Sequence, residues 1–304
     1  MPRPIALLLY LVLLATPCVA QSAGATTASE IPFSLHKGLI IVDAKIKRDV
    51  PVQVVLATGM ERSVTDLALP QKYELEANYA SDGPVTGRND STFDYTIVSG
   101  VKVGNSKAKD IHMRFGSVAE LSKIAGKEIF AALGADFFEG QTMLLDFKNN
   151  VIRFLEKTPP DLVDSKDPNY KPARAMVLRM APKPSNPFHK TYQVSLVKDV
   201  QMNGQKTSLL FDTGMATLLA LSSSTGKKLG LNVPADNEPP REEKVTLRLE
   251  SNELADVPAM VYAKGTGADQ NLSKSGGAVA GSLFLQKFVA IFDYRKGVLV
   301  LEQF

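Results

Sequence analysis

Short apolar runs dominate the chain after residue 30, and several of them alternate apolar with polar side chains. Most are rich in β-branched residues and often end at Gly, Asn, Asp or Lys, as strands do. Residues 245–249 (VTLRL) show the alternation of an antiparallel strand with one face in water. The predicted strands are 39–42, 52–56, 95–98, 151–155, 192–197, 244–249 and 298–301.

Helical patterns are few and short. Residues 64–75, 118–127 and 222–229 are the candidates, and Pro70 argues against one unbroken helix in the first of them. The third has serines at its start for an N-cap and a glycine after its end. The pattern as a whole predicts a mainly β protein with small helices.

Two tripeptides close apolar runs at matching points of the two halves. Residues 57–59 (ATG) follow 54–56 (VVL), and residues 212–214 (DTG) follow 208–211 (SLLF). The tripeptides lie 155 positions apart (212 − 57). They are too short to establish a repeat alone, so a second landmark is needed.

That landmark is a glycine followed by a turn aspartate. In each half 12 positions separate the two residues, Gly134 from Asp146 (146 − 134) and Gly281 from Asp293 (293 − 281). The glycines lie 147 positions apart (281 − 134), so the second half is 8 residues shorter between its landmarks (155 − 147). The same order with a small deletion indicates an internal duplication, in which the second copy keeps an aspartate where the first has Ala57.

The composition and net charge of the chain argue against one class of partner. The 304 residues suffice for two domains with cores of their own. A net charge of +3, from 35 basic and 32 acidic residues, provides no basic field for nucleic acid. No nucleic-acid partner is therefore expected.

The first 20 residues have the features of an export signal. Arg3 precedes an apolar stretch from 5 to 15, and residues 18–20 (CVA) supply small side chains before Gln21. The stretch is shorter than the roughly 20 residues of a membrane span, although an N-terminal anchor is the alternative. We expect a periplasmic or secreted protein with no stable membrane insertion after cleavage.

Two segments of low apolar content divide the chain after residue 20. Residues 21–30 are small and polar, which favours a flexible lead-in, and residues 158–173 contain several prolines and few apolar residues. We therefore predict an N-terminal lobe at 31–157, a linker at 158–173 and a C-terminal lobe at 174–304.

These landmarks resemble the bilobal pepsin-like aspartic peptidases, or two fused retropepsin-like units, over about residues 31 to 304. The resemblance implies two homologous β-barrel lobes, a pseudo-twofold axis and a central cleft. It implies that Asp212 is catalytic and that Thr213, Gly214, Ala57, Thr58 and Gly59 form the supporting loops, with the threonines bracing one loop against the other. It also places a possible flap at Tyr79, Ser81, Asp82 and Gly83; an ordinary exposed hairpin is the alternative.

The sequence departs from this family at the residue that carries chemistry. Ala57 stands where the family has its first catalytic aspartate, so Asp212 has no opposed acid. A pair of carboxylates shares a proton and divides the work of base and acid. Glu61 and Asp66 are the next acids along the chain, and neither is expected to reach the missing position.

Two functions remain open. The first is peptide-bond hydrolysis, impaired because one acid is missing; the second is a pseudo-peptidase that binds extended peptides between its lobes without cleaving them. The scattered histidines provide no metal-ligand set. We expect no metal and no cofactor, a peptide or protein as substrate or ligand, and a monomer.

Overall fold

The computed structural model describes residues 29–66, 68–75, 95–156, 175–183, 185–186 and 190–303. Strands predominate among them, which confirms the mainly β prediction. The expected signal peptide, the lead-in up to residue 28, the linker and the possible flap at Tyr79, Ser81, Asp82 and Gly83 lie outside the described residues. Within the described ranges, no helix has the length and apolar character needed to cross a membrane.

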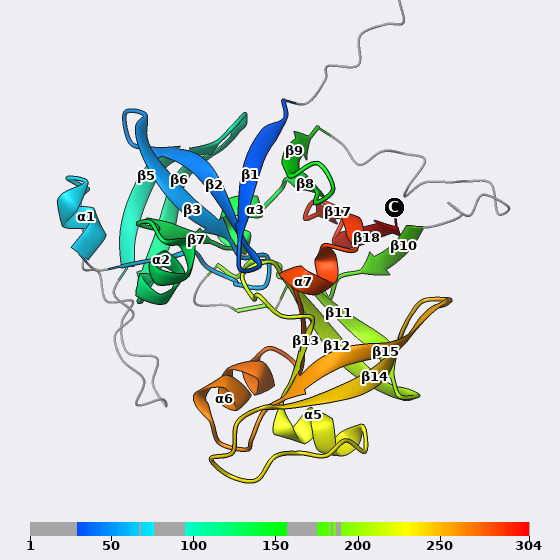
Figure 1. The fold of residues 1–304 in the computed structure, drawn as a ribbon. Helices are drawn as coiled ribbons and strands as arrows, with labels where there is room; N and C mark the ends of the chain where they lie inside the picture. The colour runs from blue at the N-terminus through cyan, green and yellow to red at the C-terminus, as the bar shows by residue number, and fades with distance from the viewer. Residues whose placement is uncertain are drawn as a thin grey trace, which may run out of the picture.

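Six strands of the first half close into a barrel in the order β2-β3-β7-β4-β6-β5 (Figure 1). Lys45 of β2 and Lys102 of β5 are the paired positions that close the ring. The strands are β2 (Leu39–Ile46), β3 (Val50–Leu56), β4 (Val64–Thr65), β5 (Tyr95–Val103), β6 (Ser106–Phe115) and β7 (Ala131–Leu133).

The second half repeats this barrel strand for strand, in the order β11-β12-β16-β13-β15-β14. In both barrels the strand that ends at the tripeptide pairs in parallel with a later strand, β3 with β7 and β12 with β16. The strands are β11 (Leu196–Met202), β12 (Gln205–Asp212), β13 (Leu219–Leu221), β14 (Arg241–Leu249), β15 (Asn252–Val261) and β16 (Ala278–Gly281).

A central run of six strands joins the lobes, in the order β10-β18-β17-β8-β9-β1. At its middle, β8 and β17 run antiparallel, with Leu144 opposite Ile291. The strands are β1 (Ile31–His36), β8 (Thr142–Asp146), β9 (Val151–Leu155), β10 (Ala175–Arg179), β17 (Phe288–Asp293) and β18 (Val298–Gln303).

The register of this junction reveals the twofold axis. Asp146 pairs with Val289, and Thr142 pairs with Asp293. The repeat spacing of 147 converts each pair into the other, since 142 + 147 is 289 and 146 + 147 is 293. The pseudo-twofold axis therefore passes through the Leu144–Ile291 pair, as the predicted fold class requires.

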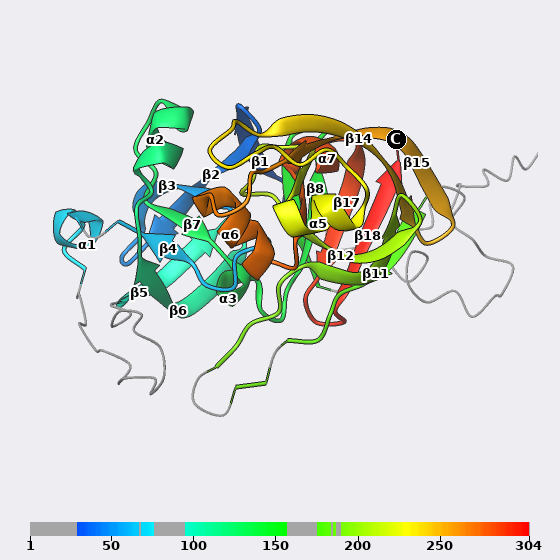
Figure 2. The same ribbon diagram turned by 90° about the horizontal axis from the view of Figure 1, so that it is seen from below.

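Short helices follow corresponding strands in both lobes, and Figure 2 shows them from below. Two predicted helices are confirmed, one as α2 and the other as α5, whose N-cap is Ser222. The described helices are α1 (Ala68–Lys72), α2 (Ala119–Ala125), α3 (Ala135–Phe138), α5 (Ser223–Lys228), α6 (Gly267–Lys274) and α7 (Ser282–Leu285).

The helix predicted from residue 64 to 75 is wrong at its start. Val64 and Thr65 form β4, which lies between β6 and β7 and completes the first barrel. The helix begins only at Ala68, whose backbone N–H donates to Asp66 Oδ1 at 3.1 Å. Val64 and Thr65 are both β-branched, so their own preference agrees with the strand that pairing with two neighbours completes.

Candidate functional site

The two tripeptide loops meet at the twofold axis. Each begins where a central barrel strand ends, β3 at Leu56 and β12 at Asp212. The parallel neighbours β7 and β16 support the strand ends, and the Ala57 N–H continues this pairing by donating to the Leu133 carbonyl at 2.9 Å. The site is thus positioned by two barrel cores and not by long loops.

Thr58 and Thr213 hold the loops together through four reciprocal hydrogen bonds. The N–H of each threonine donates to the hydroxyl of the other, both at 3.1 Å. The Thr58 hydroxyl donates to the Phe211 carbonyl at 2.9 Å, and the Thr213 hydroxyl donates to the Leu56 carbonyl at 2.7 Å. Both side chains are fully buried. Because each hydroxyl both donates and accepts, neither loop can shift without breaking bonds to the other.

The Asp212 carboxylate is hydrogen-bonded to both loops. Its Oδ1 accepts hydrogen bonds from the Gly214 N–H at 2.8 Å and the Gly59 N–H at 3.1 Å. Only 8% of the residue is exposed. Burial raises the pKa of Asp212, and the two backbone hydrogen bonds offset this increase only in part. Asp212 is therefore a more basic carboxylate than an exposed aspartate.

Ala57 occupies the position related to Asp212 by the twofold axis. A methyl group placed on Gly214 would lie 2.8 Å from the Ala57 Cβ, and one placed on Gly59 would lie 2.6 Å from the Asp212 Cβ. Both glycines are thus required by the close approach of the opposite loop. Ala57, 1% exposed, brings a methyl group where the symmetry of the site calls for a second carboxylate.

The nearby acids are engaged elsewhere. Glu61 Oε1 accepts a hydrogen bond from the Tyr192 N–H at 3.3 Å, and Asp66 Oδ1 accepts one from the Ala68 N–H at the start of α1. In the described part of the chain no second carboxylate contributes to the raised pKa of Asp212. Nor do the described residues include a group of three His, Cys, Asp or Glu side chains that could hold a metal ion.

Two further side chains adjoin the threonine loops and escaped the sequence analysis. The buried Ser195 hydroxyl lies 3.0 Å from the Thr58 carbonyl oxygen and also contacts the Phe211 carbonyl. The buried Tyr294 hydroxyl lies 3.5 Å from the same Thr58 oxygen, and burial together with the charge of Asp212 raises the pKa of Tyr294. Ser195 directly precedes β11 and Tyr294 directly follows β17, and no local motif marks either residue.

The comparison with solved structures agrees with this geometry. The chain is similar to the crystal structure of an aspartic proteinase from Irpex lacteus, with a TM-score of 0.51 over 91% of this chain and 97% of that one. The fold is that of a bilobal aspartic peptidase. The two sequences are only 10% identical, so the likeness concerns the fold and not the chemistry. No protein-family model and no curated protein matches the chain.

Proposed function

We propose that this chain is an exported pseudo-peptidase that binds extended peptides between its lobes without cleaving them. The observation that carries the proposal is the methyl group of Ala57 at the position related by symmetry to Asp212. The fold supports an origin as a peptidase, and the apolar segment at 5–15 supports export.

The mechanism of a paired-carboxylate peptidase explains why one acid is insufficient. Asp212 can take a proton from water, but the peptide carbonyl then has no acid to polarise it. The partner that would set the pKa of the base is also missing. A positioned acid or base contributes about 10²- to 10⁴-fold to rate, and coupled groups lose more than their individual share. Cleavage by the ordinary route is therefore expected to be negligible.

The peptide-binding part of the proposal rests on the two tripeptide loops. The mutual threonine hydrogen bonds keep both loops in place, and Gly59, Gly214 and Met215 are partly accessible while Ala216 is exposed. An extended peptide seated over these loops would find backbone groups to pair with, as in strand addition. A photo-crosslinking side chain at Ala216 is expected to capture extended peptides, whereas the same group at the exposed Lys244 on β14 is expected to capture none.

Restoration of the missing acid tests the catalytic part. Ala57→Asp is expected to gain acid-optimum, pepstatin-sensitive cleavage of a peptide library, because the supporting loops are already in place. The matched control Ala57→Asp/Asp212→Asn should lose that activity. The wild-type chain should cleave nothing above the uncatalysed background from acid to neutral pH.

A second candidate, slow hydrolysis by Asp212 alone, is favoured by the intact hydrogen bonds around its carboxylate. Wild-type cleavage that disappears in Asp212→Ala would establish it and refute the non-catalytic proposal. A folded Ala57→Asp variant that neither cleaves nor crosslinks would contradict the peptide-binding proposal as well.

A further inference from the structure

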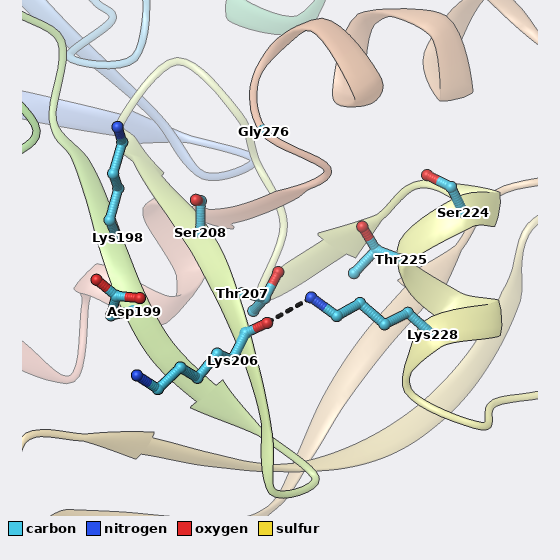
Figure 3. A pocket seen from close by; sticks show the side chains of 9 residues that line it. All are labelled: Lys198, Asp199, Lys206, Thr207, Ser208, Ser224, Thr225, Lys228 and Gly276. Carbon is cyan, nitrogen blue, oxygen red and sulfur yellow. Dashed lines mark hydrogen bonds between the residues drawn. The ribbon is translucent and has the colours of Figure 1, made fainter.

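A polar pocket of about 410 Å³ opens in the second barrel between β11, β12 and α5 (Figure 3). Ser208 at this pocket lies four residues before Asp212 on β12, roughly 13 Å along the strand. The pocket is therefore separate from the loops at the twofold axis. Its lining consists of Lys198, Asp199, Lys206, Thr207, Ser208, Ser224, Thr225, Lys228 and Gly276.

The lining has no aromatic or aliphatic side chain and combines charged groups with hydroxyls. Three ammonium groups against one carboxylate give the pocket a formal charge of +2 (3 − 1). Lys228 Nζ donates to the Lys206 carbonyl at 2.5 Å, which leaves two of its three N–H donors for a ligand. In Figure 3 this amine and the hydroxyl of Thr207 lie together between β12 and α5.

A β-bulge shapes the other wall. Val197 pairs with Leu209 and Val200 pairs with Thr207, so Lys198 and Asp199 together oppose the single residue between them on β12. Asp199 adopts φ 61°, in the left-handed region that a non-glycine residue seldom occupies. Bulges of this kind redirect side chains and occur next to binding sites.

The first lobe shows that the barrel does not need this bulge. Ser208 corresponds to Gln53 through the repeat spacing of 155 (208 − 155), and Gln53 pairs with Asp43 in an unbroken register. Those two side chains are hydrogen-bonded to each other. The first barrel closes with a regular pair here, so of these two corresponding positions only the one in the second barrel carries the bulge and its lysine.

We propose that this pocket binds a phosphorylated saccharide. The Lys228 ammonium is suited to the phosphate as a point charge, and the Thr207 hydroxyl beside it is suited to the phosphate oxygens. Lys198 and Lys206 add positive charge to the lining. The volume lies within the range of small-molecule sites and far exceeds that of a lone phosphate ion. The Asp199 carboxylate and the Ser208 and Ser224 hydroxyls provide acceptors and donors for sugar hydroxyl groups.

The test is a titration of the full mature protein with glucose 6-phosphate, followed by amide chemical shifts in NMR. Saturable shifts are expected at Thr207, Ser208 and Gly276. Lys198→Gln and Lys228→Gln should each weaken binding about two- to fivefold, the range for exposed charge pairs. Lys227→Gln, on the same helix outside the pocket lining, should bind as the wild type does.

Two parallel titrations separate the parts of the ligand. Glucose should bind more weakly than glucose 6-phosphate because it lacks the charge, and inorganic phosphate should bind more weakly because it lacks the hydroxyl groups. Equal affinity for inorganic phosphate would overturn the saccharide assignment. Absence of shifts at the pocket, or equal loss of affinity in Lys227→Gln, would overturn the site. Lys198 is exposed, so Lys198→Gln keeps the test valid if Lys228→Gln fails to fold.

Discussion

At the scale of single residues, the two loops of the site differ at one position, where Ala57 carries a methyl group and Asp212 carries a carboxylate. Ala57 fits the loop without disturbing its backbone, since its N–H pairs with Leu133 and its neighbour Thr58 makes the reciprocal hydrogen bonds. Only the carboxyl group is missing. The remaining carboxylate of Asp212 is consequently buried without an opposite acid with which to share a proton.

Asp212→Asn is expected to stabilise the protein near neutral pH. Burial raises the folded-state pKa of Asp212 above its unfolded value, so the folded state binds the proton more tightly. The ionised form is the unfavourable one, and the wild type loses stability as pH rises from about 3.9 through the folded-state pKa. Asparagine keeps an oxygen for the Gly59 and Gly214 N–H groups but is never charged.

Thermal unfolding at a series of pH values measures this effect. The Tm of Asp212→Asn should exceed that of the wild type at neutral pH, and the two curves should converge at acid pH below about 3.9. Asp236→Asn, at an exposed position, is the control and should leave Tm unchanged. A lower Tm for Asp212→Asn at neutral pH would show that the negative charge stabilises the loops.

At the scale of elements, a second buried aspartate joins two helices of the C-terminal lobe. Asp269, on α6, accepts hydrogen bonds from the Ser223 N–H at 2.7 Å and the Gly265 N–H at 2.9 Å. Thr266 caps α6 by accepting from the Asp269 N–H at 3.2 Å. The sequence analysis missed α6, although a threonine followed three residues later by an acid is an N-terminal helix signature.

Asp269→Ala is expected to destabilise the fold by about 1–3 kcal/mol near neutral pH, because two backbone donors lose their acceptor. Burial opposes ionisation of Asp269, but hydrogen bonds from Ser223 and Gly265 and the charge of Lys227 outweigh it and lower the pKa. The stabilisation is thus present above the unfolded pKa of about 3.9 and is lost as pH falls through the folded-state pKa.

Urea unfolding of Asp269→Ala and wild type, at neutral and at acid pH, checks this dependence. The difference in unfolding free energy should shrink in acid because the wild type loses the stabilisation by Asp269 there, whereas protonation of Asp212 stabilises the wild type in acid. Asp236→Ala, at an exposed position, serves as the control with a change within about 0.5 kcal/mol. A pH-independent difference would mean that packing and not ionisation accounts for the loss.

Some elements of this structure could be predicted from the sequence, and others could not. Alternation marked several barrel strands, and the spacings of 155 and 147 identified corresponding positions in the two lobes. The short strand β4 and the late start of β11 at Leu196 could not be anticipated, because both depend on neighbours distant in sequence. At the site, the tripeptides marked both loops, whereas Ser195 and Tyr294 reach Thr58 across separations of 137 and 236 residues.

At the scale of the whole molecule, the threonine pair is a fully buried polar link between the lobes. Thr58→Val keeps the shape of the side chain but leaves the Thr213 N–H without its acceptor, whereas the Phe211 carbonyl still accepts from the Ser195 hydroxyl. We expect a loss of about 1–3 kcal/mol, the cost of one buried group left unpaired. Thr213→Val should lose more, about 2–6 kcal/mol, because it leaves both the Thr58 N–H and the Leu56 carbonyl unpaired.

A double-mutant cycle measured by urea unfolding tests the coupling. The two substitutions share one network, so the combined loss should be smaller than the sum of the single losses. Thr246→Val, at a half-buried position of β14, is a matched control with an expected change within about 0.5 kcal/mol. Strict additivity would indicate that the two loops respond independently and that the hydrogen bonds do not couple the lobes.

The central sheet makes a further prediction about the molecule as a unit. Because β8 and β17 pair along their lengths, the two lobes share one continuous set of strands and should unfold together. The chain has no tryptophan, so Tyr95→Trp and Tyr262→Trp place a fluorescent probe in each lobe separately. The two probes should report the same unfolding midpoint.

Ile291→Ala, at the buried twofold junction, should lower the free energy of unfolding by about 2–5 kcal/mol. Both probes should then report the same decrease in the midpoint. Separate midpoints, or a shift confined to the second lobe, would show that the barrels are independent folding units and that the sheet merely connects them.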